Sequence, residues 1–271
     1  YGSLGLPMWP AVVGHGPGII PPGANGMVEV DAFSYGFDFI DFPPMAPPPV
    51  TPDWTLWVFS VDEFSGGVPG SAVNAQVMPP PSPVTNAAAD LFAASSKLVR
   101  PITTLTPVGT NSALLDGDGV IPGVPAGLNL VEPTAGTFGV AFKPGSNLDG
   151  VDIEYPQFDI PLPPPVFFSL DSGFFDPLDG LPNTGSALAN GLLSGAMIAV
   201  SRPGLPPMPL IPPVALGLDV FGPGTDDVDA LVYKGNVYNP QYVPPTGPYS
   251  WAGGGTDMIF FSVRRGSRVI G

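Results

Sequence analysis

Closely spaced aspartates are the residues of this chain best suited to carry chemistry. One cluster follows the turn-forming stretch 222–225, and a second follows the turn-forming stretch 144–147. Hard cations such as Ca²⁺ take about six to eight oxygen ligands, and carboxylates held in turns supply such oxygens. We therefore expect calcium at one or more of these clusters. The candidate ligands are Asp226, Asp227, Asp229, Asp149, Asp152, Asp116 and Asp118.

An aspartate at the start of a strand also has a simpler role. Its side chain accepts hydrogen bonds from the nearby backbone and forms an Asx turn without any metal. The segment from Asp116 begins like a calcium-binding EF-hand loop, but Val120 stands at its fifth position and Gly127 at its twelfth. Metal binding and turn formation therefore both stay open for these aspartates.

Groups that catalyse reactions are poorly represented. The chain has no cysteine, its one histidine is His15, and no Gly-x-Ser-x-Gly phrase marks a nucleophile. Glycoside hydrolysis needs two carboxyl groups roughly 5–10 Å apart, and 23 acidic residues form such pairs by chance. The acids to consider, each with a neighbouring aspartate, are Glu29, Glu63, Glu132 and Glu154. We predict that the protein is not an enzyme, with a carboxylate-dependent glycoside hydrolase as a less favoured alternative.

One phrase occurs three times and indicates how these residues are positioned. Its first part is an Asp-x-β-branched-Asp tetrad, found at 38–41, 149–152 and 226–229. Its second part is an aromatic strand containing Phe-Ser, found at 57–61, 166–170 and 259–263. A repeated unit of this kind usually cannot bury its apolar face alone and stacks on its neighbours. We therefore predict an all-β repeat protein.

Each repeat is expected to hold several strands. A Leu-Gly-Leu-type element at 127–130 and 216–218 would precede the Asp tetrad, and an Ala-rich strand at 89–92 and 196–199 would follow the Phe-Ser strand. About four strands per repeat is typical of a propeller blade. We predict one β-propeller-like domain over 1–271, with tandem β-sandwiches as the alternative. The approximate units are 1–110, 111–205 and 206–271, the last of them incomplete.

Glycine and proline shape the connections between the strands. The chain has 36 Gly and 40 Pro, and stretches such as 42–52 and 78–83 hold too many prolines for strand interiors. We expect long loops there and at most one or two short helices, at 86–99 and 184–193. Residues 216–221 are expected to form a strand.

The charge and the ends of the chain indicate its compartment and partners. With a net charge of −15 and only 8 Lys and Arg, the surface repels phosphate backbones, which argues against nucleic acid as a partner. No run reaches the about 18 apolar residues of a membrane span. Because the chain begins at Tyr1 without a signal-peptide pattern, we expect a secreted or cell-surface protein whose signal peptide has been removed.

Three phrases carry a resemblance to a known group of proteins. Segments 226–231, 116–123 and 260–263 are similar to phrases in uncharacterised exported bacterial proteins that carry DDLDAL-type and FFSL-type β repeats in tandem. The resemblance covers the chain from about residue 55 to its end. It implies export and a repeat fold, and it implies no activity, cofactor or catalytic residue.

Doubled aromatic residues indicate how the units pack. The pairs Phe167-Phe168 and Phe260-Phe261 place rings on both faces of a strand, which suits a doubly buried sheet or a contact between subunits. A basic cluster near the end of this acidic chain would suit the same kind of contact. The candidate interface residues are Phe167, Phe168, Phe260, Phe261, Arg264, Arg265 and Arg268.

These features together predict a structural or adhesive protein. It would self-assemble, or join other extracellular subunits in a surface or filament assembly, with calcium stiffening its turns. The alternative is a carbohydrate- or peptide-binding module on the loop face of a β-propeller. The aromatic residues that would form its platform are Tyr238, Tyr242, Tyr249 and Trp251.

Overall fold

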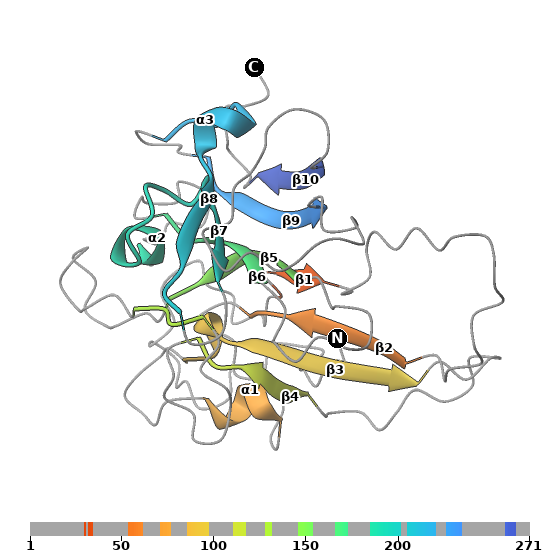
Figure 1. Cartoon of the computed structure of the whole chain (residues 1–271). Helices are drawn as coiled ribbons and strands as arrows, with labels where there is room; N and C mark the ends of the chain where they lie inside the picture. Colours follow the sequence, from red (N-terminus) through yellow and green to blue (C-terminus); the bar gives the residue numbers. More distant parts are fainter. Residues whose placement is uncertain are drawn as a thin grey trace, which may run out of the picture.

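The computed structural model of the chain contains three antiparallel β-sheets stacked in chain order (Figure 1). The structure describes residues 30, 32–34, 54–61, 71–76, 86–97, 111–117, 128–131, 146–153, 166–172, 185–201, 205–220, 226–234 and 258–263. Within these residues it has ten strands and only short, single-turn helices. The all-β prediction is therefore confirmed.

Two of the sheets are four-stranded meanders, and the third has two described strands. The first unit comprises β1 (Phe33–Ser34), β2 (Trp54–Phe59), β3 (Leu91–Lys97) and β4 (Ser112–Leu115). The second unit comprises β5 (Leu148–Ile153), β6 (Val166–Leu170), β7 (Ile198–Ser201) and β8 (Met208–Ile211). The third unit comprises β9 (Val228–Lys234) and β10 (Met258–Val263).

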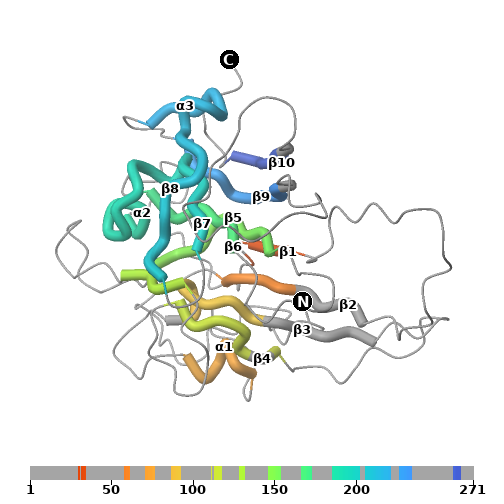
Figure 2. Tube along the Cα trace, viewed as in Figure 1, coloured from red at the N-terminus to blue at the C-terminus, as the bar shows by residue number. Residues whose placement is uncertain are grey.

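The units differ from the expected repeat at their boundaries. Because β4 belongs to the first sheet and β8 to the second, these sheets extend past residues 110 and 205. The Leu-Gly-Leu-type elements supply no strand where the structure describes them, since 128–131 is irregular and 216–218 comprises the end of a short helix and the turn after it. The second sheet therefore begins with β5, the strand that carries Asp149 and Asp152. Within the described part of the chain the sheets form an open row and not a closed ring (Figures 1 and 2).

Three single-turn helices and one 3₁₀ turn occur in the described residues. They are α1 (Ala72–Ala75), η2 (Asn86–Ala89), α2 (Ser186–Ala189) and α3 (Pro213–Leu216). The expected helix over 86–99 stops after the 3₁₀ turn, because its second half pairs with β2 as strand β3. The expected strand over 216–221 is wrong, because Pro213 starts α3 and Gly217 ends it in the left-handed conformation at φ 74°.

The strand register corrects the alignment of the three repeats. Phe33 lies opposite Phe59, Val151 opposite Phe168, and Leu231 opposite Phe261. The repeated first-strand phrase is therefore hydrophobic-Asp-small-hydrophobic, at 30–33, 148–151 and 228–231. Asp149 thus corresponds to Asp229 and not to Asp226, and the tetrad at 38–41 lies outside the described residues.

A β-bulge recurs at this aspartate. Leu148 pairs with Leu170 and Gly150 with Ser169, so that Asp149 is the extra residue of the bulge. In the third unit Val228 pairs with Val263 and Ala230 with Ser262, so Asp229 is likewise the extra residue of a bulge. Because a bulge inserts one extra residue and turns its side chain out of the regular alternation, it gives these aspartates a direction that other strand residues lack.

The serine of each Phe-Ser phrase joins one unit to the next. Ser60 Oγ of the first unit donates to the Leu148 carbonyl of the second at 2.8 Å, and Ser169 Oγ donates to the Val228 carbonyl of the third at 2.6 Å. Both serines are fully buried. The repeated serine therefore has a structural explanation, since it ties the sheet to the backbone of its neighbour.

The first strands of the three units are also linked directly. The Ile153 amide donates to Ser34 Oγ at 3.3 Å, and the Tyr233 amide donates to Asp152 Oδ2 at 2.9 Å. Ser34 Oγ in turn donates to Asp152 Oδ1 at 3.1 Å. Strands β1, β5 and β9 are thereby connected in sequence through Asp152.

The hydrophobic core lies between the units and explains the doubled phenylalanines. All five residues of β6 are buried, because Phe168 packs toward the first unit and Phe167 toward the third. The Phe167 ring lies 4.4 Å from the ring of Tyr233, centroid to centroid. A separate cluster around Phe59 and Val73 fills the first unit beneath α1. Across the described residues, no helix has the length and apolar character that crossing a membrane requires.

Candidate metal centre

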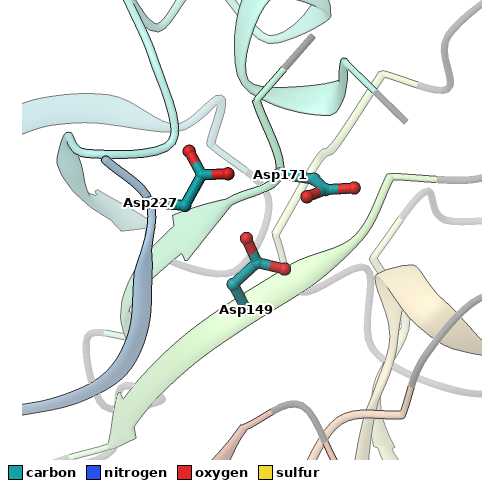
Figure 3. A group of neighbouring side chains, drawn as sticks. All are labelled: Asp149, Asp171 and Asp227. Atoms are coloured by element: carbon teal, nitrogen blue, oxygen red, sulfur yellow. The ribbon is translucent and has the colours of Figure 1, made fainter. Parts of the chain in front are cut away.

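Three aspartates from different segments meet where the second and third units join. Asp149 lies in the bulge of β5, Asp171 directly follows β6, and Asp227 directly precedes β9. One carboxylate oxygen from each lies within 4.8 Å of the others. Figure 3 shows the three side chains approaching one another from these segments. Asp171 and Asp227 are buried, while Asp149 is partly exposed.

Backbone hydrogen bonds fix the segments that carry the three carboxylates. The Asp171 amide donates to the Asn147 carbonyl at 3.2 Å, which holds the end of β6 against the start of β5. The Val228 amide donates to the Gly195 carbonyl at 3.2 Å, which holds the start of β9 beside the turn before β7. The site is thus built from main-chain contacts and does not depend on long side chains.

Gly195 leaves the space that the Asp227 carboxylate occupies. A Cβ atom at this position would clash with Asp227 Oδ1 and would lie 2.7 Å from the carbonyl oxygen of Leu170. The requirement for glycine here is therefore one of close approach. The same geometry brings a backbone carbonyl oxygen beside one carboxylate of the group.

Asn147 directly precedes β5 and contacts the group through Asp149. Its Nδ2 donates to Asp149 Oδ1 at 3.3 Å, and its backbone amide donates to Ser186 Oγ at 3.2 Å. The side chain is only 6% exposed, and its Oδ1 is buried with no hydrogen-bond partner. Buried amide oxygens normally have a partner, so this atom calls for an explanation.

Electrostatics favour a positive charge among the three carboxylates. Two unit charges about 4.8 Å apart repel by about 3 kcal/mol at the effective dielectric constant of about 20 that suits protein sites. The oxygen-only ligand set is the kind that hard divalent cations prefer.

The other predicted ligands have different surroundings. Asp152 accepts hydrogen bonds from Ser34 and from the Tyr233 amide, and Asp226 Oδ2 accepts one from the Asp219 amide at 2.8 Å. Asp229 lies in the bulge of β9, and Asp116 is buried directly after β4. Among the described residues none of these four joins a group of three possible metal ligands. Asp118 lies outside the described residues, as do Tyr238, Tyr242, Tyr249 and Trp251.

Asp171 is the member of the group that the sequence analysis missed. Its signal lies in the repeat, because Asp62 and Asp171 each stand two residues after the serine of a Phe-Ser phrase, at Ser60 and Ser169. The third phrase has Arg264 at that position. Extending the repeated phrase by two residues would have added Asp171 to the candidates.

No protein-family model, curated protein or solved structure matches this chain.

Proposed function

We propose that this chain is an extracellular structural or adhesive protein that associates with copies of itself, end to end, through its terminal β units. The observation that carries this proposal is a face of the third unit that is exposed, although the same face of the first two units is buried. We call this the forward face, meaning the sheet face that carries the Phe-Ser serine.

The forward face is covered in the first two units. In the first unit its residues are Ala32, Ser34, Val58 and Ser60, and in the second unit they are Gly150, Asp152, Phe167 and Ser169. All eight are buried, because the next unit packs on them. Apolar residues and a serine donor are thus the regular means by which one unit holds the next.

The forward face of the third unit is composed similarly but is open. Its residues are Ala230, Val232, Phe260 and Ser262. Ala230 and Ser262 are exposed, and Phe260, at the register position of the buried Phe167, is 60% exposed. A large exposed apolar side chain at a position that is elsewhere an interface marks a site of association.

The opposite end of the stack has a matching exposed position. Phe33 is 36% exposed, whereas Val151 and Leu231, at the same register position, are 1% and 2% exposed against the preceding unit. A contact between two different ends of one molecule is heterologous, and it yields rings if the rotation closes and filaments if it does not. We include a propeller-like ring of blades in the proposal as the closed form.

Several further features support an extracellular setting. The low content of charged residues, the many proline-rich loops and the resemblance to exported bacterial repeat proteins all agree with a surface or filament component. Proline-rich loops also limit unwanted pairing of exposed strand edges. Calcium would stabilise the fold of each chain.

Sedimentation velocity of the purified chain over a range of concentrations tests the proposal. We expect the wild-type mass to rise with concentration and the Phe260→Ser variant to need about tenfold higher concentration or more, as for loss of a central interface aromatic. Leu188→Ser is the control, because Leu188 is exposed to the same 60% as Phe260 but lies on α2, between β6 and β7 of the second unit. A wild-type chain that stays monomeric, or a control that dissociates equally, would contradict the proposal.

A further inference from the structure

We propose that Asp149, Asp171 and Asp227 bind one divalent cation, with Ca²⁺ preferred over Mg²⁺, and that this ion joins the second unit to the third. Asn147 completes the site through its side-chain oxygen, and the Leu170 carbonyl lies beside it. The site is independent of the end-to-end association proposed above, because it lies between units of one chain.

Asn147 is the observation, apart from the carboxylates, that points to a ligand. Its carboxamide contacts Asp149 through Nδ2, and its buried Oδ1 has no hydrogen-bond partner. A half-turn of the carboxamide exchanges the two atoms and places Oδ1 on the side of Asp149. That orientation is unfavourable beside a bare carboxylate, and it becomes favourable when a cation lies between the two oxygens.

Gly195 provides a second observation that points to oxygen ligands beside Asp227. The position of its missing Cβ lies within contact distance of both the Asp227 carboxylate and the Leu170 carbonyl. Backbone carbonyls and amide oxygens commonly accompany carboxylates around Ca²⁺. Three carboxylates, one amide oxygen and one carbonyl would leave room for water in the remaining positions of a Ca²⁺ shell.

The ligand set distinguishes between the two common cations. The three carboxylate oxygens lie within 4.8 Å of one another, a span that either Ca²⁺ or Mg²⁺ can bridge. Ca²⁺ takes about six to eight oxygens in flexible geometry and accepts amide and carbonyl oxygens, whereas Mg²⁺ demands a near-ideal octahedron and usually keeps several waters. A site that offers three carboxylates, one amide oxygen and one carbonyl therefore favours Ca²⁺.

Two of the aspartates belong to the second unit and one to the third. Asp149 and Asp171 are held on β5 and at the end of β6, whereas Asp227 precedes β9. An ion shared between them therefore opposes the separation of β9 from β5. It acts at the same junction as the hydrogen bond from Ser169 to the Val228 carbonyl.

Titration calorimetry on the full chain, stripped with a chelator and then given CaCl₂ or MgCl₂, tests the site. We expect one Ca²⁺ per chain, weaker binding of Mg²⁺, and at least a tenfold loss of Ca²⁺ affinity in Asp149→Asn and Asp171→Asn. Asp229→Asn is the matched control, because Asp229 occupies the equivalent bulge in the third unit but lies outside the group. Its affinity should equal that of the wild type.

Thermal unfolding provides a second readout. In chelator, the difference between the unfolding temperatures of Asp171→Asn and the wild type gives the effect of the substitution without the ion. Adding Ca²⁺ should raise the unfolding temperature of the wild type and leave that of Asp171→Asn nearly unchanged, because only the wild type binds the ion tightly. If the stripped wild type is folded but binds no Ca²⁺, or if Asp149→Asn binds as tightly as Asp229→Asn, the proposal is overturned.

The same titration on the Phe260→Ser variant separates this inference from the proposed function. We expect its Ca²⁺ affinity to be unchanged even where its association is lost. Loss of both together would mean that the ion binds between chains and not within one, and would overturn the site as proposed.

Discussion

Asp152 is the residue through which side chains and backbone of all three units are connected. Its two oxygens accept from Ser34 Oγ of the first unit and from the Tyr233 amide of the third, while Asp152 itself lies on β5 of the second. It is 3% exposed. A buried acceptor of this kind matters mainly because its loss leaves donors unsatisfied.

Replacing Asp152 tests this connection. Asp152→Ala should lower the free energy of unfolding by about 3 kcal/mol, because a buried amide and a buried hydroxyl lose their acceptor. Asp152→Asn should cost only about 1 kcal/mol, because its oxygen still accepts from the Tyr233 amide and its amide nitrogen can donate to Ser34. Urea unfolding gives both values.

The control for Asp152 is Asp219→Ala, since Asp219 is exposed and its hydrogen bond to Asp226 is donated by the backbone amide, which the substitution keeps. It should change the free energy of unfolding by less than about 0.5 kcal/mol. Equal costs for Asp152→Ala and Asp152→Asn would show that the two hydrogen bonds contribute little.

Only part of the group formed by Asp149, Asp171 and Asp227 could be predicted at the level of single residues. Asp149 and Asp227 were among the candidates, but sequence proximity grouped Asp227 with Asp226 and Asp229. The structure separates these three, because Asp226 turns to the Asp219 amide and Asp229 sits in its own bulge. Neighbours in a strand point in different directions, so a group of ligands usually draws one residue from each of several segments.

At the scale of single strands, the serines of two Phe-Ser phrases can be compared, because one is buried and the other exposed. Ser169 and Ser262 occupy the same place in β6 and β10, but Ser169 donates to the Val228 carbonyl and is buried, whereas Ser262 is exposed. Ser169→Ala should lower the free energy of unfolding by about 1 kcal/mol, and Ser262→Ala by less than about 0.5 kcal/mol. Chemical denaturation of dilute protein, where association is negligible, measures both.

The same pair of serines tests the proposed association. If the forward face of the third unit binds another chain, Ser262→Ala should weaken that association while leaving the stability of the single chain unchanged. An equal loss of stability in the two variants would show that their surroundings do not differ as the structure indicates.

The strands themselves were largely predictable, and the errors have physical causes. Segments 166–170 and 258–263 are rich in aromatic and β-branched residues, and both form strands. The alanine-rich segment 86–99 favours a helix locally, but pairing with β2 outweighs this weak preference. The misalignment of the Asp phrases came from matching letters without the register, because Asp226, Asp227 and Asp229 each offer an alignment with Asp149. Only the pairing of Leu231 with Phe261, equivalent to that of Val151 with Phe168, selects Asp229.

At the scale of the whole molecule, charge is distributed unevenly along the chain. Three of the eight Lys and Arg residues, Arg264, Arg265 and Arg268, fall in the last eight positions of a chain with net charge −15. They lie outside the described residues but directly follow β10. An acidic neighbour of the same kind would attract them at low ionic strength.

Replacing all three arginines with Ser should therefore weaken self-association at low salt and have little effect at about 1 M salt, where charges are screened beyond about 3 Å. Sedimentation at the two salt concentrations measures the difference. Unchanged sedimentation of the variant at low salt would exclude an electrostatic part in the association. Phe260→Ser should differ by losing association at both salt concentrations.

The contacts that join the units have a consequence for how such a chain can vary over evolution. The serines donate to main-chain carbonyls, and the Tyr233 amide that reaches Asp152 also belongs to the main chain. The receiving residue is Leu148 in one case and Val228 in the other, and the hydrogen bond forms with both. A contact of this kind constrains the donor side chain only, because the accepting residue can change its side chain and keep the carbonyl. Substitutions at the two positions are therefore not expected to be correlated. It also allows whole units to be duplicated or lost without redesign of their neighbours.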